Sequence, residues 1–563
     1  MKLRFLSSLM CVALVFGAAN CAVAERQQLP GKQHVPEAVT DGSAKLVAHA
    51  DAAQRYELAL ALPVRNQAGL DALLAEQQNP HSAMYHRWLT VEEFAARFAP
   101  TPAEYARVRE ELKAQGFEIT AEHENRLAIS FAGSTAQVER AFHVTMNLYQ
   151  HPTEGRVFYA PDREPVIDAE TPVLLIAGLD NYVLPHARLK HNPAQPADEN
   201  KITARTTKCT YNVDLGNGAC GTYSPTNLRT AYYGGTAETG SGQQIGILGF
   251  GGALTTDITL MAGQENQTAP TVTYVLGSAC AAKCADGEQV LDIIFSSGMA
   301  PGAKINFFSN ASNDLTIINK MASSKVSSVY TCSWGWGKTN HAAEDTDFQE
   351  MQTQGQTFLN ATGDDGGYNS STWDYPSGDP YITEVGGTSL KTNGVGGGWS
   401  SETGWSDSSG GVATGISYTI PTWQAPAANS SNGISTTKRS DPDISAEADF
   451  NQLSCSKGKC TDGWGGTSYA APQWAGYFAM VNQARVAAGA ATLGFANPSL
   501  YTIGLGSSYD SNFHDITACE TGTNPCNDSD EGSPVVGFDT VVGFDDVTGW
   551  GSPNGSGLIT SLK

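Results

Sequence analysis

The sequence predicts a small α+β domain followed by a large α/β domain with a parallel sheet. Three features lead to this prediction. Alternating strands and capped helices fill residues 45–185, a polar stretch without apolar periodicity covers 187–208, and from about residue 209 apolar strands alternate with helices. Strands that are apolar on both faces and linked by helices indicate a parallel sheet, and roughly 350 residues suffice for a large core.

The order of elements in the first domain fits a ferredoxin-like sandwich. The predicted strands are 56–60, 117–120, 126–131 and 144–149, and the predicted helices are 70–77, two helices that start at the capping boxes of Thr90 and Thr101, and 135–142. The polar stretch that follows is rich in Pro, Asn, Lys and Arg, so we expect a cleavable linker.

In the second domain, strands are predicted at 245–248, 304–308, 326–332 and 357–360, and a helix at 290–295. Gly, Ser or Asp bounds these segments. The abundance of Gly, Ser and Thr predicts long loops, where substrates are usually held.

The first residues are typical of an export signal. Basic Lys2 and Arg4 precede an apolar core at 5–19, and small residues at 22–24 suit cleavage after residue 24. We therefore expect a secreted protein, with the periplasm as a possible transit compartment. No later stretch is long and apolar enough to cross a membrane, so no membrane partner is expected.

Nine of the eleven cysteines remain after removal of the signal, and eight of them fall in close pairs. In an exported protein such pairs indicate short-range disulfides; zinc is the alternative, but the spacings do not form a CxxC…CxxC set. The pairs are Cys209/Cys220, Cys280/Cys284, Cys455/Cys460 and Cys519/Cys526. Cys332 is left over, and we expect it to be buried in a strand.

The net charge of −23 is concentrated in the second domain: 33 of the 57 acidic residues but only 16 of the 34 basic residues lie from residue 201 onward. Such a surface repels nucleic acid. It also suits a protein that works at low pH, because protonation of carboxylates removes self-repulsion. Exported proteins are often acidic, so the charge alone does not establish that this protein works at low pH.

Two carboxyl groups at the start of the helix predicted around 290–295 are candidates for acid-base chemistry. Glu288 and Asp292 are four residues apart and so share one helix face. Two carboxylates this close share protons, which raises one pKa and lets that group accept and return a proton. The alternative is a solvated helix face, which the flanking apolar residues disfavour.

Ser468 follows a glycine pair and Thr467, and a helix is predicted at 469–480. Its Oγ would lie near the helix N-terminus, where partial positive charge favours a developing oxyanion. The alternative is an ordinary N-cap serine. Downstream of residue 200 only His341 and His514 could serve a Ser/His/Asp triad. Asp364 lies in a Gly-Asp-Asp-Gly turn after a strand, where α/β sheets place ligand contacts.

Together these segments resemble the sedolisin family of serine-carboxyl peptidases, subtilisin-fold proteases in which glutamate replaces the catalytic histidine. The N-terminal part resembles the family's propeptide in Asn79-Pro80-His81-Ser82, Tyr85-His86-Arg87-Trp88-Leu89 and Phe98-Ala99-Pro100. The C-terminal part carries, in order, Glu288-x-x-Leu291-Asp292, Ser333-Trp334-Gly335, Gly363-Asp364-x-Gly366, Val385-Gly386-Gly387-Thr388 and Gly466-Thr467-Ser468-x-x-x-Pro472. Gly465 departs from the family, which commonly has serine there.

The resemblance implies a role for each candidate. Ser468 would be the nucleophile, Glu288 the general base and acid, Asp292 the group that orients Glu288, and Asp364 an oxyanion-hole acid that is protonated in the active enzyme. The segment Ser333, Trp334 and Gly335 would bind extended substrate as an edge strand.

The resemblance also implies a domain plan and partners. It gives a signal at 1–24, a propeptide at 25–186, a linker at 187–208 and a subtilisin-like seven-stranded parallel sheet in 209–563. We expect an autoprocessed, acid-active endopeptidase that acts as a monomer on proteins and peptides. The propeptide would be its intramolecular inhibitor and folding aid.

Near the C-terminus the chain resembles the family's calcium site. The implied ligands of one Ca²⁺ are the side chains of Asp515 and Asp545 and the carbonyls of Ile516, Val541 and Gly543, completed by water. The insert between them begins like an EF-hand at Asp528, but its fifth and sixth positions are Gly532 and Ser533, so we reject that interpretation.

Three other functions were weighed. An esterase would use Ser468 in a near GxSxG motif with His514, but only Asp510 lies between them as the acid. A glycosidase would use the paired carboxylates with Trp334, Trp336 and Trp373 as sugar platforms. A non-enzymatic module would require a decayed site, whereas all four catalytic positions are filled.

Overall fold

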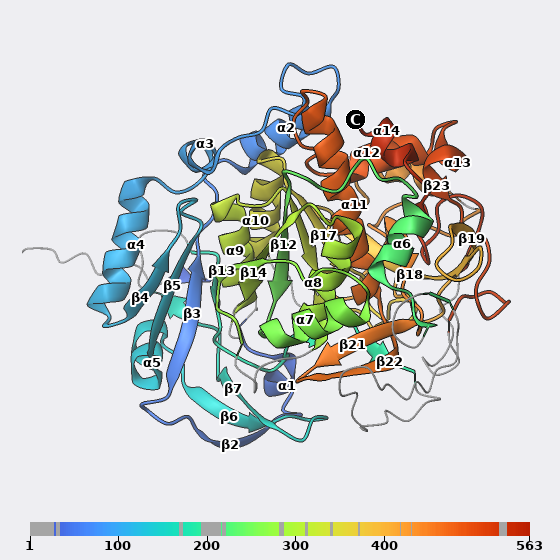
Figure 1. Cartoon of the computed structure of the whole chain (residues 1–563). Helices are drawn as coiled ribbons and strands as arrows, with labels where there is room; N and C mark the ends of the chain where they lie inside the picture. The colour runs from blue at the N-terminus through green and yellow to red at the C-terminus, as the bar shows by residue number, and fades with distance from the viewer. Residues whose placement is uncertain are drawn as a thin grey trace, which may run out of the picture.

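The computed structural model describes residues 27–29, 34–167, 173–192, 215–216, 221–280, 287–309, 313–337, 342–369, 372–416, 418–429, 431–527 and 538–563. The predicted export signal, Cys209, Cys220 and Cys284 lie outside these residues. Figure 1 shows an N-terminal domain (34–185, blue to cyan) beside a larger C-terminal domain (221–563, green to red). None of the helices in the described ranges combines the length and hydropathy needed to cross a membrane.

The N-terminal domain is built on a four-stranded antiparallel sheet in the order β4-β5-β3-β9. Helices α4 and α5 pack on one face of it through side chains such as Val108 and Phe142. Along the chain, α4 follows the first strand of this sheet, β3, and α5 follows the third, β5. This is the predicted ferredoxin-like arrangement. The elements are β1 (Gln27–Gln28), α1 (Glu37–Thr40), β2 (Lys45–His49), β3 (Arg55–Ala61), α2 (Gln67–Gln78), α3 (Val91–Arg97), α4 (Pro102–Ala114), β4 (Glu118–Glu122), β5 (Ala128–Ser134), α5 (Thr135–Phe142), β6 (Met146–Gln150), β7 (Val157–Pro161), β8 (Val166–Ile167) and β9 (Leu175–Ala177).

The C-terminal domain contains an eight-stranded sheet. Seven strands are parallel, in the order β13-β14-β12-β15-β17-β18-β20, and β19 pairs with β18 in the antiparallel direction. The predicted parallel sheet is therefore confirmed, with one antiparallel strand added. The strands are β12 (Gln244–Gly249), β13 (Val272–Leu276), β14 (Lys304–Ser309), β15 (Val329–Cys332), β16 (Trp334–Gly335), β17 (Thr357–Ala361), β18 (Thr383–Thr392), β19 (Trp399–Gly404), β20 (Ile444–Glu447), β21 (Gln452–Ser456), β22 (Lys459–Gly465), β23 (Phe513–His514) and β24 (Ser552–Pro553).

Helices cover both faces of this sheet because neighbouring side chains on its strands point to opposite sides. Ile247 and Phe307 join one apolar cluster with α8 and α11, whereas Leu248 and Phe308 join another with α9 and α10. The helices are α6 (Pro225–Tyr232), α7 (Thr255–Gln264), α8 (Gly287–Met299), α9 (Asp314–Ser324), α10 (Ala342–Thr353), α11 (Thr467–Ala487), α12 (Asn497–Gly504), α13 (Tyr509–Asn512) and α14 (Gly557–Ser561).

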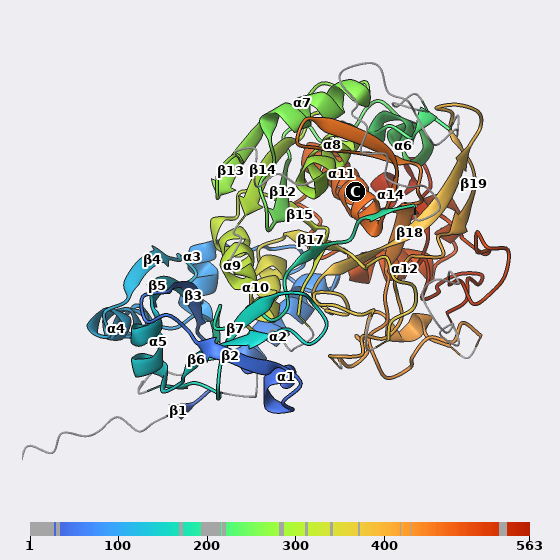
Figure 2. The same ribbon diagram turned by 90° about the horizontal axis from the view of Figure 1, so that it is seen from below.

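The two domains meet across α9 and α10, which lie between the two sheets in Figure 2. The face of the N-terminal sheet that α4 and α5 leave open carries the small side chains Ala59 and Ala61. These pack against Leu315 of α9 and Ala343 of α10. Small residues on that face let the sheet approach the helices closely.

Two of the predicted disulfides are confirmed, Cys455–Cys460 and Cys519–Cys526. The first joins the neighbouring strands β21 and β22. Cys280 is also disulfide-bonded. Cys332 is a buried free cysteine at the end of β15, as predicted.

Candidate active site

Helix α8 carries two of the four predicted catalytic residues and is buried along its whole length. Glu288 lies in its first turn and Asp292 one turn later, with exposed fractions of 1% and 0%. The alternative of a solvated helix face is therefore wrong. Two acidic side chains on a buried helix indicate a site rather than a surface.

Ser468 lies in the first turn of α11, directly after β22. Its Oγ donates to the carbonyl oxygen of Ser333 at 3.3 Å, and its backbone N–H donates to the carbonyl oxygen of Arg188 at 3.2 Å. The cap residue Gly466 has φ 148°, and a Cβ there would lie 2.4 Å from that same Arg188 oxygen. Glycine is thus required both by the backbone conformation and by the close approach of another chain segment.

Asp364 follows β17 and is tied to the start of α11. Its Oδ1 accepts hydrogen bonds from Thr467 N and Thr467 Oγ1, both at 2.8 Å. Its Oδ2 makes no hydrogen bond within the part of the chain that is described, and it faces Gly466, where a Cβ would lie 2.9 Å away. Burial raises the pKa of Asp364 to about 6, against the lowering effect of the Thr467 hydrogen bonds.

Ser333 connects the serine to the carboxylates. Its Oγ donates to Asp292 Oδ1 at 2.6 Å, while its carbonyl oxygen accepts from Ser468. The phenol of Tyr469, next to Ser468, has its pKa raised first by burial and then by the charges of Glu288, Glu265, Asp292 and Asp364. The structure therefore gathers the four predicted catalytic residues around the start of α11.

This chain is similar to several known proteins. Residues 43–182 match the Pro-kumamolisin activation domain, and residues 273–493 match the subtilase family. The chain is 28% identical over 530 residues to sedolisin from Pseudomonas sp. (strain 101), covering 86% of this chain and 85% of that protein. The solved structure of Pseudomonas sedolisin, a serine-carboxyl proteinase in complex with pseudo-iodotyrostatin, aligns with a TM-score of 0.50 and 25% identity, covering 62% of this chain and 99% of that one.

The chain belongs to the sedolisin family. It is also 27% identical over 514 residues to xanthomonalisin from Xanthomonas sp. (strain T-22), covering 79% of this chain but 59% of the length of that protein. As a family member it is a serine-type peptidase, and its activation domain makes it a proenzyme.

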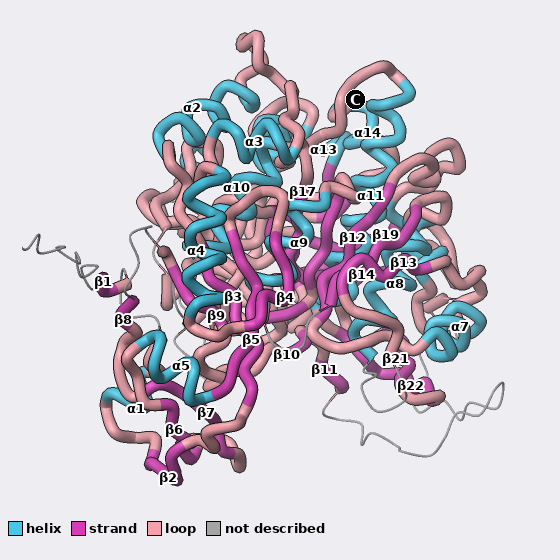
Figure 3. Tube along the Cα trace, turned by 90° about the vertical axis from the view of Figure 1, so that its left-hand side faces the viewer, coloured by secondary structure: helices cyan, strands magenta, loops and turns pink. Residues whose placement is uncertain are grey.

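Residues 187–192 of the predicted linker, together with His186 before them, lie in the cleft of this family member. They form two short strands, β10 (His186–Ala187) and β11 (Lys190–His191). Strand β10 pairs with β16 and β11 pairs with β22, both in the antiparallel direction. In Figure 3, β10 and β11 lie on the path from the N-terminal domain toward β21 and β22. The predicted substrate segment Trp334–Gly335 is thus paired with the chain's own linker.

A pocket of about 370 Å³ opens beside this linker. Glu288, Trp334 and Trp464 line it together with the linker residues Ala187 and Leu189. The predicted base therefore faces a space next to the bound peptide, where water has room.

The residues that the alternative functions need are placed elsewhere. His514 stacks on Trp399 with ring centroids 3.8 Å apart, and burial lowers its pKa to about 4. His341 lies outside the described residues. Trp336 and Trp373 are 4% and 0% exposed, so they offer no open platform for a sugar, and Trp334 is covered by the linker residue Ala187.

The residues predicted to hold calcium gather at one loop, although Asp515 and Asp545 are thirty positions apart. Asp515 Oδ1 accepts from Gly543 N at 3.1 Å, and Asp545 Oδ2 accepts from Val541 N at 3.0 Å. Burial raises the pKa of both carboxyl groups. Ile516, directly after Asp515, is 1% exposed. Within the described residues no three His, Cys, Asp or Glu side chains form a metal cluster, so a cation here depends on carbonyl ligands.

Two contributors to the site were not predicted. Thr467 holds Asp364 through two hydrogen bonds, and Arg188 places its carbonyl group against Ser468. A signal for Arg188 does exist in the sequence: the run His186-Ala-Arg-Leu-Lys-His191 is basic, whereas the domain it contacts is acidic.

Proposed function

We propose that this chain is a secreted, acid-active endopeptidase that hydrolyses peptide bonds through an acyl-enzyme on Ser468 and is made as a self-processing monomeric proenzyme. The main support is the position of the linker in the cleft. The carbonyl oxygen of its residue Arg188 accepts a hydrogen bond from the backbone N–H of Ser468 at 3.2 Å. Residues on both sides of that carbonyl pair with cleft strands, which suits cleavage within a chain rather than at its end.

Each catalytic group has a chemical task. Ser468 Oγ attacks the carbonyl carbon, and Glu288 takes the hydroxyl proton and returns it to the leaving amine. Asp292, held by Ser333 Oγ at 2.6 Å, orients Glu288. The oxyanion receives hydrogen bonds from Ser468 N–H and from the protonated Oδ2 of Asp364.

The requirement for a proton on Asp364 explains the expected activity in acid. A carboxyl group donates to an oxyanion only while it holds a proton. Burial raises the pKa of Asp364 to about 6, so the donor is present below that pH and is lost above it. Lys190 of the linker lowers this pKa, so its movement out of the cleft after cleavage favours the protonated form further.

The assignment is tested with Ser468→Ala, Glu288→Ala and Asp364→Ala on a protein substrate at about pH 4. Because the three groups act as one unit, each substitution is expected to cost several orders of magnitude in turnover. Ser507→Ala, an exposed serine, is the matched control and should be fully active. Near-full turnover in any of the three variants would contradict the proposal. Pepstatin should not inhibit, since the carboxylates serve a serine.

Calcium is the proposed cofactor, with Asp515 and Asp545 and the carbonyls of Ile516, Val541 and Gly543 as ligands. Asp545 is buried and Asp515 is half-buried, and both accept hydrogen bonds from backbone N–H groups and from the hydroxyl groups of Thr548 and Tyr509, respectively. Their carboxylate oxygens suit a hard cation that prefers oxygen. When bound, the ion neutralises these carboxylates and ties the C-terminal loop to β23. It is not needed for any chemical step at Ser468.

Chelation near neutral pH should lower the melting temperature by several degrees, because an ion that binds only the folded state stabilises it. Asp545→Ala should remove this sensitivity, whereas the exposed neighbour Asp510→Ala should keep it. Elemental analysis that finds no calcium in protein purified without chelator would exclude the site and leave the peptidase assignment intact.

Secretion is proposed from the sequence alone. N-terminal sequencing of the protein recovered outside the cell should find the signal at 1–24 removed.

A further inference from the structure

The linker crosses the cleft in two short strands, β10 and β11, which are held on either side of Ser468. Before the serine, His186 and Ala187 pair with Gly335 and Trp334, and Arg188 N donates to Ser333 O at 3.0 Å. After it, Lys190 and His191 pair with β22, and Asn192 N donates to Gly463 O at 2.9 Å. This ladder fixes the register of the linker relative to the nucleophile.

The register places one peptide bond at the reacting atoms. The carbonyl oxygen of Arg188 accepts from Ser468 N and lies beside Gly466, on the side that Asp364 Oδ2 also faces. That is the position in which the oxyanion is stabilised in the proposed mechanism. The bond in line for attack is therefore Arg188–Leu189.

The side chain of Arg188 occupies a closed pocket and is 4% exposed. Its guanidinium lies over Gly335, where a Cβ would come within 3.1 Å of Nε and Nη2. Nη2 donates to the carbonyl oxygen of Asp374 at 3.2 Å, and the buried Nη1 makes no hydrogen bond in the described part of the chain. A side chain at 335 would crowd this position.

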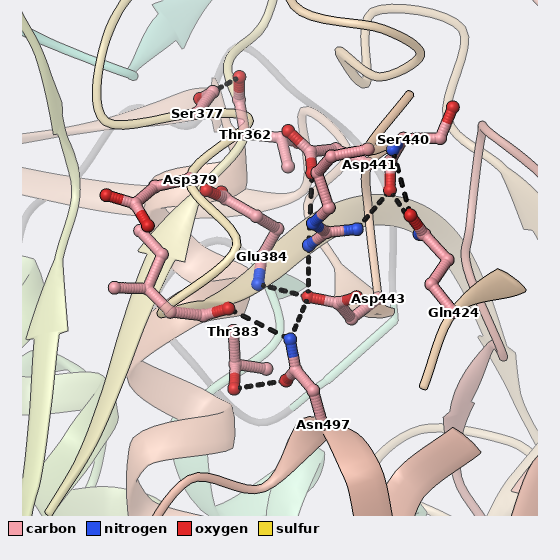
Figure 4. A network of polar contacts seen from close by, with 12 residues as sticks. Thr362, Ser377, Asp379, Thr383, Glu384, Gln424, Ser440, Asp441, Asp443 and Asn497 are labelled. Carbon is pink, nitrogen blue, oxygen red and sulfur yellow. Dashed lines mark hydrogen bonds and ion pairs between the residues drawn. The ribbon is translucent and has the colours of Figure 1, made fainter. Parts of the chain in front are cut away.

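The surroundings of that pocket are acidic. Figure 4 shows Glu384, Asp441 and Asp443 in one network of polar contacts. Arg439 pairs with Asp441 at 3.1 Å and with Asp443 at 2.7 Å, and Glu384 Oε2 accepts from Asn360 Nδ2 at 2.8 Å.

Burial raises the pKa of Glu384 and of Asp441, and the charges of Arg439 and Arg188 lower both. Three carboxyl groups thus share one resident cation, and Arg188 supplies a second. When the linker leaves, Glu384 and Asp441 lose the positive charge of Arg188. Such a pocket favours a cationic side chain over an apolar one.

The flanks of the linker show the same charge complementarity. His186 Nε2 lies 3.1 Å from Asp374 Oδ2, and Lys190 Nζ lies 3.0 Å from Asp365 Oδ1. These pairs are partly exposed and contribute little stability each. They add to the register without determining which side chain enters the buried pocket.

We propose that the enzyme cleaves after basic residues, arginine above all, and that Arg188–Leu189 is its first substrate, cut within its own chain. This proposal rests on the proposed peptidase function. Ser468 Oγ bonds to the Arg188 carbonyl carbon, the bond to Leu189 nitrogen breaks, and the serine proton passes through Glu288 to the Leu189 amine. A water molecule then hydrolyses the ester, which leaves a carboxylate on Arg188 and regenerates Ser468.

The first test is a short time course of acidified, purified full-length proenzyme, with N-terminal sequencing and intact mass of the earliest product. The expected new N-terminus is Leu189. Arg188→Gln should slow its appearance at least about tenfold, because the buried acidic groups then lose their cationic partner. Arg188→Lys keeps the charge and should restore most of the rate. An earliest cut at another bond in the wild type, or equal rates for Gln and Lys, would overturn the proposal.

The second test uses mature wild-type enzyme and quenched peptides that differ only in the residue before the scissile bond. Arginine should exceed leucine and glutamate by about tenfold or more in kcat/KM. In Glu384→Gln the preference for arginine over leucine should shrink. A preference for leucine in an enzyme that still depends on Ser468 would refute this inference alone, whereas activity that survives Ser468→Ala would refute the proposed function.

Discussion

The N-terminal part of the chain holds the C-terminal domain at two places, and these differ in how they respond to acid. At the domain interface, Leu89 N donates to Thr353 O at 2.9 Å and Arg485 Nη2 donates to His86 Nδ1 at 2.7 Å. In the cleft, the linker is held by a ladder of backbone hydrogen bonds such as Arg188 N to Ser333 O.

The interface contains a half-buried histidine, His86, that titrates in the acid range. Burial and the neighbouring Arg485 lower the pKa of His86 to about 4. Below that pH two cations face each other at the interface, whereas the backbone ladder of the linker does not titrate. We therefore expect acid to weaken the His86 contact of the N-terminal domain while the backbone hydrogen bonds keep the bond to be cut in place.

The largest expected effect concerns the cleft and its donor Asp364. Wild-type activity should fall about tenfold per pH unit above about pH 6, because the proton on Asp364 is then lost. In Asp364→Asn the amide donates at every pH, so this decline should disappear even though turnover in acid is lower. The measurement is the pH profile of kcat/KM for mature enzyme between pH 3 and 8. An unchanged profile in Asp364→Asn would assign the decline to another group.

A smaller effect is expected at the interface in His86→Gln. The folded-state pKa of His86 lies below its usual 6.5, so its contribution to the interface is complete above that pH and is lost as the pH falls toward 4. Glutamine accepts from Arg485 without titrating, so the interface should open at a pH lower by about half a unit or more.

Hydrogen exchange of the Leu89 amide in a Ser468→Ala background measures this opening without cleavage. The exposed His81→Gln is the control and should open at the wild-type pH. Equal opening in both variants would show that His86 is not the trigger.

The smallest effect is expected at Glu350, whose Oε2 accepts a hydrogen bond from Asn125 Nδ2 at 2.7 Å across the interface. Unlike the His86 contact, this contact is favoured by acid. Burial raises the pKa of Glu350 from 4.5 to about 8. Its contribution to stability is therefore complete below about 4.5 and is lost as the pH rises through 8. Glu350→Gln should raise the melting temperature of the proenzyme by a few degrees at pH 8 and leave it unchanged at pH 4. Glu124→Gln, an exposed neighbour of the interface, should change neither value.

Local rules predicted much of the fold. The capping boxes at Thr90 and Thr101 are both present, and the helix predicted at 135–142 has those bounds. Strand 357–360 differs from β17 by one residue. These elements depend on the chemistry of neighbouring residues, which a single sequence contains.

Non-local pairing accounts for what was missed. The linker has no apolar periodicity, and its strands β10 and β11 exist only because β16 and β22 supply partners more than a hundred residues away. The role of Thr467 in holding Asp364 was also missed, because it depends on Asp364 lying beside the start of α11. The antiparallel strand β19 likewise follows from its pairing with β18 rather than from its composition.

The central claim is that Ser468 cuts the linker already bound in its own cleft. Its most direct test is intact mass measurement of purified Ser468→Ala proenzyme held at about pH 4 without other proteases, beside wild type at several dilutions. We predict that Ser468→Ala stays at full length while wild type is cut at a rate independent of its concentration. Normal maturation of Ser468→Ala, or a wild-type rate that falls in proportion to dilution, would contradict the account.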